Sequence, residues 1–170
     1  MLFEGKQSKF ENLVRAFSAE LYRYAYWLCR DRFVAQDLVQ ETFMRAWQAW
    51  EHLNDERAAK AWLYTILRNE HARLFERKKL AIDDEQDLGE IPSVAASNPL
   101  AAFEIREAIY ALPQTFRDPL LLQVLGGFSC SEIARLMSIS EGAVMTRLTR
   151  ARQALRQLSG WNPARKKEAS

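Results

Sequence analysis

The sequence has little of what a metal site, a disulfide framework or an enzyme active site requires. Its two cysteines, Cys29 and Cys130, are far apart and form no Cys-x-x-Cys spacing. Its two histidines, His52 and His71, do not occur in an HExxH-like pattern. A glycine-rich phosphate loop and a nucleophile elbow are also lacking. We therefore expect no catalytic activity, no metal ion, no cofactor and no small-molecule substrate.

Long apolar runs are lacking too. No window of about 18 apolar residues could span a membrane, and no basic segment followed by an apolar run marks a signal peptide. The alternation of β-branched residues that is typical of strands does not occur. We therefore expect a cytoplasmic, all-α protein. With 48% hydrophobic residues among 170, the chain can form one medium domain or two small ones.

Acidic residues dominate only in the middle of the chain. Residues 1–80 carry 14 Lys or Arg against 11 Asp or Glu, residues 81–99 carry none against 5, and residues 100–170 carry 10 against 6. The middle segment also lacks apolar periodicity and contains one glycine and two prolines. We therefore predict two helical domains, 1–80 and 100–170, joined by an acidic flexible linker over 81–99.

Apolar residues recur at helical spacing in both domains. The predicted helices cover residues 10–28, 33–50, 59–79, 99–112, 118–125, 129–137 and 140–155. Asp118 is expected to cap its helix, with Pro119 in the first turn, and Ser129 with Glu132 has the spacing of a capping box. The short helix, the three-residue turn and the longer helix at the end have the lengths of a helix-turn-helix.

The last predicted helix has one apolar side. With Val144 at the centre of a helical wheel, Leu148, Ala151 and Leu155 fall within about 40° of it and should pack on the preceding helix. The other sides carry small, hydroxyl, amide and guanidinium residues: Gly142, Thr146, Arg147, Thr149, Arg150, Arg152 and Gln153. Such groups read base edges and phosphates in the major groove of DNA.

The arginines of this helix lack acidic partners in the sequence. No Asp or Glu lies between Gly142 and Gly160, whereas a solvated surface helix would usually pair its charges along the helix. Small residues at Gly142 and Ala143 would let the amino end of the helix approach a phosphate closely. We therefore predict that this helix binds DNA.

The third predicted helix combines aromatic and cationic residues. Its apolar side carries Leu63, Ile66, Leu67 and Leu74, which leaves Tyr64, Arg68, His71 and Phe75 nearly opposite and Arg77, Lys78 and Lys79 at its end. Aromatic rings stack on unpaired bases while cations follow the backbone, so this side suits single-stranded nucleic acid. Packing of Tyr64 and Phe75 on another helix or on a partner is the alternative.

The second predicted helix displays apolar residues beside charges. Leu38 and Met44 are expected on its polar side with Asp37, Glu41 and Arg45. Apolar area that provides affinity, with charge that fixes register, is typical of a protein-binding surface. We therefore predict that this side of the helix contacts a partner protein.

Five segments, in this order and spacing, resemble the extracytoplasmic-function (ECF) sigma factors of bacterial RNA polymerase. They are "AQDLVQETFMRAW", "AWLYTILRN" followed by basic residues, the acidic linker, "ALPQTFRDPLLL" and "GFSCSEIARLMSISEGAVMTRLTRAR". The resemblance covers residues 10–158. Within the family, the cobalt–nickel-resistance type is the one that the chain resembles most. The resemblance implies a first domain that is sigma region two, a second that is sigma region four, and promoter-specific transcription initiation under an anti-sigma factor, often membrane-anchored.

The resemblance also implies a role for each surface. The residues that would bind the β′ clamp helices of the polymerase are Asp37, Gln40, Glu41 and Arg45. Those that would lie beside the melted minus-ten strand are Tyr64, Arg68, Asn69 and the basic residues that follow. Residues 50–60 would capture an extruded minus-ten base, and Thr146, Thr149 and Arg150 would read the minus-thirty-five duplex. Region four would also contact the β flap.

Two positions depart from the family pattern. Four residues after Asn69 the family usually has Asp or Asn, where this chain has Arg73. Met145 stands where Lys or Arg is common. The expected fold is unchanged, but the promoter preferences of relatives do not transfer to this chain.

Other functions fit the residues less well. Asp37 and Glu41 place two carboxylates on one helical face, but acid–base or metal chemistry would need further ligands. A sigma mimic that binds an anti-sigma factor but no promoter would not retain the arginines of the last helix. A helix-turn-helix repressor would usually dimerise, and no coiled-coil seam for that is present in the sequence.

Overall fold

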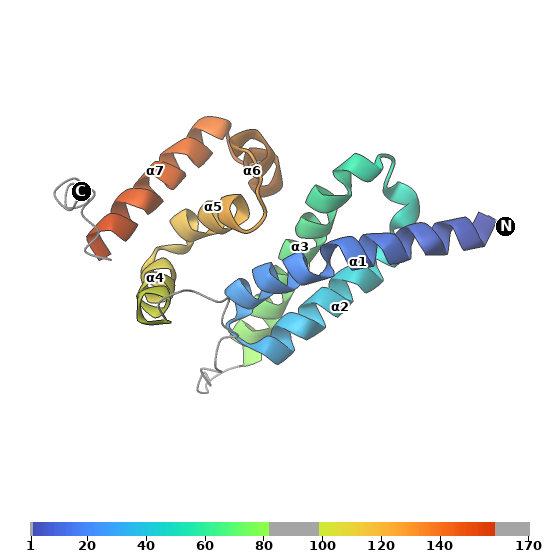
Figure 1. Ribbon diagram of the computed structural model, residues 1–170, viewed down its shortest axis with the longest axis horizontal. Coiled ribbons are helices and arrows are strands. Elements are labelled where there is room, and N and C mark those ends of the chain that lie inside the picture. The colour runs from blue at the N-terminus through green and yellow to red at the C-terminus, as the bar shows by residue number, and fades with distance from the viewer. Residues whose placement is uncertain (1, 82–98, 159–170) are drawn as a thin grey trace. The chain divides into compact units, whose positions relative to one another are not determined.

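The protein is all-α in the part that the structure describes. The computed structural model describes residues 2–81 and 99–158, and these residues form helices and connecting turns without a β-strand (Figure 1). The predicted fold class is therefore confirmed.

The chain divides into two compact units, residues 1–91 (unit 1) and 92–170 (unit 2). Each unit has its own set of contacting helices and its own buried residues. The predicted acidic linker over 81–99 lies outside the described residues except for its two end positions, which close one helix and open the next.

Unit 1 is a bundle of three helices, drawn from blue to green in Figure 1. Its elements are α1 (Leu2–Cys29), α2 (Arg32–Gln48), the single-turn 3-10 helices η1 (Trp50–His52) and η2 (Glu56–Ala58), and α3 (Ala59–Ala81). Every pair among α1, α2 and α3 is in contact. The three helices agree with the predicted ones, except that α1 begins earlier and α2 ends two residues earlier.

The turn between α1 and α2 is tight. Arg30 adopts a left-handed backbone with φ of 57°. The Asp31 carboxylate then accepts hydrogen bonds from the backbone N–H groups of Phe33 and Val34, at 2.8 and 3.0 Å. These bonds satisfy donors that the first turn of α2 would otherwise leave unpaired.

The core of unit 1 is formed by aliphatic and tyrosine side chains. Leu21 and Tyr24 from α1, Leu38 from α2, and Leu63 and Leu67 from α3 are all buried. Burial of such side chains contributes about 1.5 to 3 kcal/mol each to folding. The hydrophobic surfaces of the three helices therefore fix one another in place.

The described part of unit 2, residues 99–158, contains four helices, two of which form a helix-turn-helix. They are α4 (Pro99–Ala111), α5 (Gln114–Val124), α6 (Cys130–Met137) and α7 (Glu141–Leu158). The longest of them, α7, contacts each of the other three. The core between them includes Leu121, Leu122, Ile133, Val144 and Leu148.

The predicted start of α5 at Asp118 is wrong. The helix begins at Gln114, where the Pro113 carbonyl accepts from the N–H groups of Phe116 and Arg117. Pro119 therefore lies inside the helix, in its second turn, and is buried. Proline is tolerated best in the first turn of a helix, so the sequence rule placed the start of α5 one turn too late. Pro119 has no N–H group and leaves one helical hydrogen bond unmade, and burial of Pro119 and the following leucines compensates for this loss.

The turns of the helix-turn-helix follow the sequence closely. The capping box predicted at Ser129 and Glu132 is present, with both reciprocal hydrogen bonds. Ser138 ends α6 in a left-handed conformation, and Ser140 accepts a hydrogen bond from Ala143 N–H at the start of α7. These caps set the angle at which α7 leaves α6.

Candidate nucleic-acid and protein interfaces

One side of α7 is buried and the other is open. Val144, Leu148 and Ala151 are buried, which confirms the predicted packing stripe for these three residues, whereas the fourth, Leu155, is half-buried. The residues on the predicted reading side, Thr146, Thr149, Arg150 and Gln153, are all exposed. We call these four residues the α7 ridge.

The amino end of α7 is also open. A Cβ placed on Gly142 would meet no atom within 4 Å, and Gly142 is exposed. Helix amino termini attract phosphates because their first N–H groups lack helical partners and carry partial positive charge. Gly142 therefore leaves room for a DNA backbone at this end of the ridge.

The three arginines of α7 that were predicted to bind DNA differ in their partners. Arg152 donates a hydrogen bond of 2.6 Å to the amide oxygen of Gln123 on α5, so its guanidinium is directed toward α5. Arg147 is half-buried and Arg150 is exposed, and neither forms a hydrogen bond or ion pair within the described residues. Among these three arginines, Arg150 is therefore the one most available to an external ligand.

Tyr64 is wrongly placed by the sequence prediction. It is completely buried between α3 and α1, with its ring centroid 4.9 Å from that of Tyr24. Its hydroxyl donates to the Glu20 carboxylate at 2.9 Å, and Lys60 approaches the same carboxylate at 2.9 Å. Burial raises the pKa of Tyr64 well above its usual range, and the bond to Glu20 raises it further. Tyr64 cannot stack on a base without unfolding the unit.

Arg68 also faces inward more than predicted. It is half-buried and donates a hydrogen bond of 3.0 Å to the Tyr24 hydroxyl. Three of the predicted residues that follow Arg68 on α3 are more open: Asn69, Phe75 and Arg77 are exposed, and Phe75 has 59% of its surface accessible. His71 is half-buried, with its ring 5.1 Å from that of Phe75. Lys78 and Lys79 were also predicted to belong to this site, but their side chains lie outside the part that the structure describes.

On α2, the prediction that Leu38 lies at the surface is wrong. Leu38 is 1% exposed and belongs to the core. Because α2 contacts both α1 and α3, more of its circumference is buried than the single apolar side that a helical wheel predicts. Asp37, Gln40 and Met44 are exposed as predicted.

Sequence reasoning missed two further residues on this side of α2. Phe33 and Trp47 are exposed, with 63% and 41% of their surfaces accessible. Their spacing from Met44, at 11 and 3 residues, places all three on one side of the helix. A wheel drawn over the whole helix would have revealed them. We call Phe33, Asp37, Gln40, Met44 and Trp47 the α2 face.

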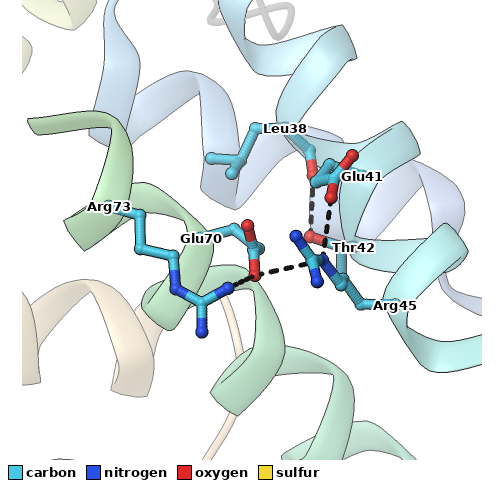
Figure 2. A network of polar contacts seen from close by, with 6 residues as sticks. All are labelled: Leu38, Glu41, Thr42, Arg45, Glu70 and Arg73. Carbon is cyan, nitrogen blue, oxygen red and sulfur yellow. Dashed lines mark hydrogen bonds and ion pairs between the residues drawn. The ribbon is translucent and has the colours of Figure 1, made fainter. Parts of the chain in front are cut away.

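A polar network joins α2 to α3 beside this face (Figure 2). Arg45 forms ion pairs with Glu41, at 2.8 Å, and with Glu70 of α3, at 3.6 Å. Glu70 also pairs with Arg73, at 2.8 Å, and its side chain is only 11% exposed. Glu41 and Arg45 were predicted to bind a partner; within the chain Arg45 already pairs with Glu41 of its own helix and with Glu70 of α3.

An aromatic cluster supports the segment between α2 and α3. The Phe10 ring contacts those of Trp47 and Trp50, with centroids 5.0 and 5.3 Å apart. Ion pairs from Lys6 to Glu51 and from Lys9 to Glu56 join the first turns of α1 to the same segment. These contacts hold Trp50, Glu51 and Glu56, which belong to the segment 50–60 for which base capture was predicted.

The described residues offer no metal site and no membrane span. No group of three or more His, Cys, Asp or Glu side chains lies close enough together among them to hold a metal ion. No helix within the described ranges is long and apolar enough to cross a membrane.

Both units match known family models. Residues 13–80 match the model described as Sigma-70 region 2, and residues 102–155 match Sigma-70, region 4. The ECF RNA polymerase sigma factor SigM of Bacillus subtilis is 31% identical over 87% of this chain and 93% of its own length. The ECF RNA polymerase sigma factor SigL of Mycobacterium tuberculosis is 34% identical over 82% of each chain.

Two solved structures of similar proteins are complexes with a protein partner. The sigma factor RpoE, solved in complex with the anti-sigma factor NepR from Bartonella quintana, matches with a TM-score of 0.75 and 28% identity, covering 88% of this chain and 96% of its own. CnrH, solved in complex with the cytosolic domain of CnrY, matches with a TM-score of 0.69 and 25% identity, covering 89% and 88%. The resemblance seen in the sequence is therefore confirmed by all three kinds of comparison.

Proposed function

We propose that this chain, which belongs to the ECF family of RNA polymerase sigma factors, binds core RNA polymerase and directs initiation at specific promoters. Sigma factors are initiation factors, and the chain is not an enzyme. It would act in the cytoplasm, where the polymerase and the chromosome are.

The observation that carries the proposal is the α7 ridge. Its hydroxyl, amide and guanidinium groups are exposed because the opposite stripe of α7 is buried in unit 2. A helix presented in this way by a helix-turn-helix fits the major groove of duplex DNA, where base edges are read. Arg150 would read a base, while Arg147 and Arg152 would lie nearer the phosphate backbones.

Unit 1 would bind the polymerase and the unpaired minus-ten strand. The α2 face combines three large exposed apolar side chains with Asp37 and Gln40, a composition suited to a protein interface such as the β′ clamp helices. Phe75, with Asn69 and Arg77 nearby on α3, offers a ring for base stacking and a cation for the backbone. Unit 2 would also contact the β flap.

Run-off transcription with purified core polymerase across genomic fragments tests the proposal. The wild-type chain should produce discrete transcripts, and Arg150→Ala should weaken promoter binding by about 1 to 3 kcal/mol, or about 5- to 150-fold. Arg15→Ala removes an equal charge from an exposed position on α1 and should have no such effect. Failure of the wild-type chain to direct initiation would refute the proposed function.

Permanganate footprinting of the open complex tests the role of α3. Phe75→Ala should reduce the reactivity of melted thymines more than it reduces duplex binding, because only unpaired bases can stack on the ring. Phe103→Ala is the matched control, since Phe103 is a phenylalanine of unit 2 with a similar exposure of 54%. Equal melting by the Phe75→Ala variant and the wild type would remove Phe75 from the proposed site.

An anti-sigma factor, membrane-anchored in our proposal, would regulate the chain. The two similar structures are both complexes with such regulators or with the cytosolic domain of a partner. A regulator that covers the α2 face would block polymerase binding directly. Purified core polymerase should then displace it in competition, and binding of both partners at once would contradict this mode of inhibition.

A further inference from the structure

We infer that the first turns of α1, through Lys6, Lys9 and Phe10, position the segment 50–60 for capture of an unpaired base. The inference rests on the proposed function, in which unit 1 binds the unpaired minus-ten strand. It adds positioning residues that act through this segment rather than on DNA. All three precede residue 13, where the match to Sigma-70 region 2 begins, so they lie outside the part of the chain that this family model describes.

The three residues lie on one side of α1. Their spacing of three and four residues places them on neighbouring turns of the same helical face. At about 100° per residue, this is also the side on which Leu21 and Tyr24 enter the core of unit 1. The side of α1 that packs in the core therefore continues toward its amino end as the side that carries Lys6, Lys9 and Phe10.

Two ion pairs attach α1 to both single-turn helices of the segment. Lys6 Nζ lies 3.3 Å from Glu51 Oε1 in η1, and Lys9 Nζ lies 2.8 Å from Glu56 Oε1 in η2. The turn between η1 and η2 lies between these two attachment points along the chain. Attachment at two points of one helix restricts how η1 and η2 are oriented, whereas attachment at one point would let the segment pivot.

Aromatic contacts add to the ion pairs, which are weak by themselves. Solvent screening and the ordering of long side chains cancel much of the attraction of an exposed ion pair. Phe10, however, is half-buried, and its ring centroid lies 5.3 Å from that of Trp50 in η1. Lys6 Nζ also lies 5.2 Å from the ring centroid of Trp47, within the range of a cation–π interaction. The rings therefore provide most of the attachment, and the ion pairs fix its register.

The ion pairs also neutralise negative charge on the segment. The side chains of Glu51 and Glu56 are 84% and 69% exposed. Carboxylates without cationic partners would repel the phosphates of a strand that approaches this segment. Lys6 and Lys9 therefore hold the segment and reduce its repulsion of DNA at the same time.

A segment that is ordered in advance favours base capture. A single base offers few contacts, and ordering the backbone of several residues at the moment of capture would oppose binding. When α1 holds the segment beforehand, this ordering has already taken place during folding. We therefore expect promoter melting to depend on the two lysines, and polymerase binding not to.

The test compares charge variants of the full chain in two measurements. Lys9→Glu places a second carboxylate opposite Glu56. It should speed hydrogen exchange about three- to tenfold at the hydrogen-bonded amides of Leu53, Arg57 and Ala58. With core polymerase, it should lower the permanganate reactivity of minus-ten thymines by a similar factor. Lys9→Glu combined with Glu56→Lys restores an ion pair and should return both quantities toward the wild-type values.

Arg15→Glu is the matched control. It makes the same charge reversal at an exposed position of α1, six residues after Lys9 and on another side of the helix. It should change neither hydrogen exchange nor melting. Equal effects of Arg15→Glu and Lys9→Glu would show that the net charge of α1 matters rather than the contact with Glu56, and would overturn the inference.

The remaining outcomes separate the inference from the proposed function. Reduced melting by Lys9→Glu without faster exchange, or without recovery in the charge-exchanged variant, would mean that Lys9 contacts DNA directly, and the inference would fail. Faster exchange with unchanged melting would also overturn it, while melting by the wild type leaves the proposed function intact. If the wild type melted no promoter, the proposed function would be refuted and the inference with it.

Discussion

Each unit contains one helix that was predicted to bind DNA, α3 in unit 1 and α7 in unit 2. The two helices differ in how much of their circumference is buried. In unit 2 the fully buried residues of α7 form a single stripe, and every residue of the ridge is exposed. In unit 1 the successive residues Leu63 and Tyr64 are both fully buried, although successive residues point about 100° apart on a helix. This is possible because α3 contacts both α1 and α2.

This difference explains why one helical wheel succeeded and the other failed. A wheel assigns residues to a buried half and an exposed half, which suits α7. It fails where two neighbouring helices flank the same turns, because a polar or aromatic residue beside the apolar stripe is then buried as well. The last buried residue of α3 among those described is Glu70, and Phe75, beyond it, is exposed as the wheel predicted.

The largest expected effect contrasts Tyr64 with Phe75. Tyr64→Ala should lower the free energy of unfolding of unit 1 by about 3 to 5 kcal/mol, because it leaves a large cavity between α1 and α3. Phe75→Ala should change it by less than about 1 kcal/mol, since its ring is mostly exposed. Urea unfolding followed by tryptophan fluorescence measures both. Comparable losses would show that the two rings are equally enclosed.

Leu38 and Met44 give the same contrast on α2. Leu38→Ala should destabilise unit 1 by about 2 to 5 kcal/mol, as expected for a buried leucine. Met44→Ala should leave the unfolding free energy nearly unchanged but weaken binding to core polymerase by about 1 to 2 kcal/mol. Titration of labelled chain with core polymerase measures the second effect. Normal polymerase binding by Met44→Ala would exclude it from the proposed interface.

Because of the Tyr64 hydroxyl, the free energy of unfolding of unit 1 should depend on pH in the alkaline range. Its pKa is raised in the folded chain by burial and by Glu20, whereas the unfolded chain releases the proton near the usual value of about 10. The stability from this group is therefore complete below pH 10 and is lost as the pH rises above it. Tyr64→Phe should cost about 1.5 to 3 kcal/mol near pH 7, and its deficit should shrink above pH 10. A constant deficit would contradict the bond to Glu20.

The sequence predicted local features better than relations between helices. The capping box at Ser129 and the buried residues around Val144 depend on residues close together in the chain, and both predictions are confirmed. Helix boundaries were less well predicted, since α5 begins one turn before the predicted start. The burial of Tyr64 depends on Glu20, which is 44 residues away and gives no periodic signal. The network from Glu41 to Arg73 likewise became visible only when α2 and α3 were placed side by side (Figure 2).

The smallest expected effect concerns that network. Glu70→Gln keeps the shape of the side chain but removes the charge that pairs with Arg45 and Arg73. Glu70 is nearly buried, whereas about half of each arginine side chain is exposed and screened by solvent. The loss should therefore be about 1 to 2 kcal/mol of unfolding free energy, and it should decrease at high salt.

Glu76→Gln on the exposed side of α3 is the control, and it should change stability little. If Glu70→Gln were as mild as this control, α2 and α3 would be held together by apolar packing alone. Arg45 would then be free to bind the polymerase, as the sequence first indicated. A measurable loss would instead mean that a partner must compete with Glu70 for Arg45. Binding of a partner at the α2 face would then loosen the contact between α2 and α3, the helix proposed to lie beside the melted strand.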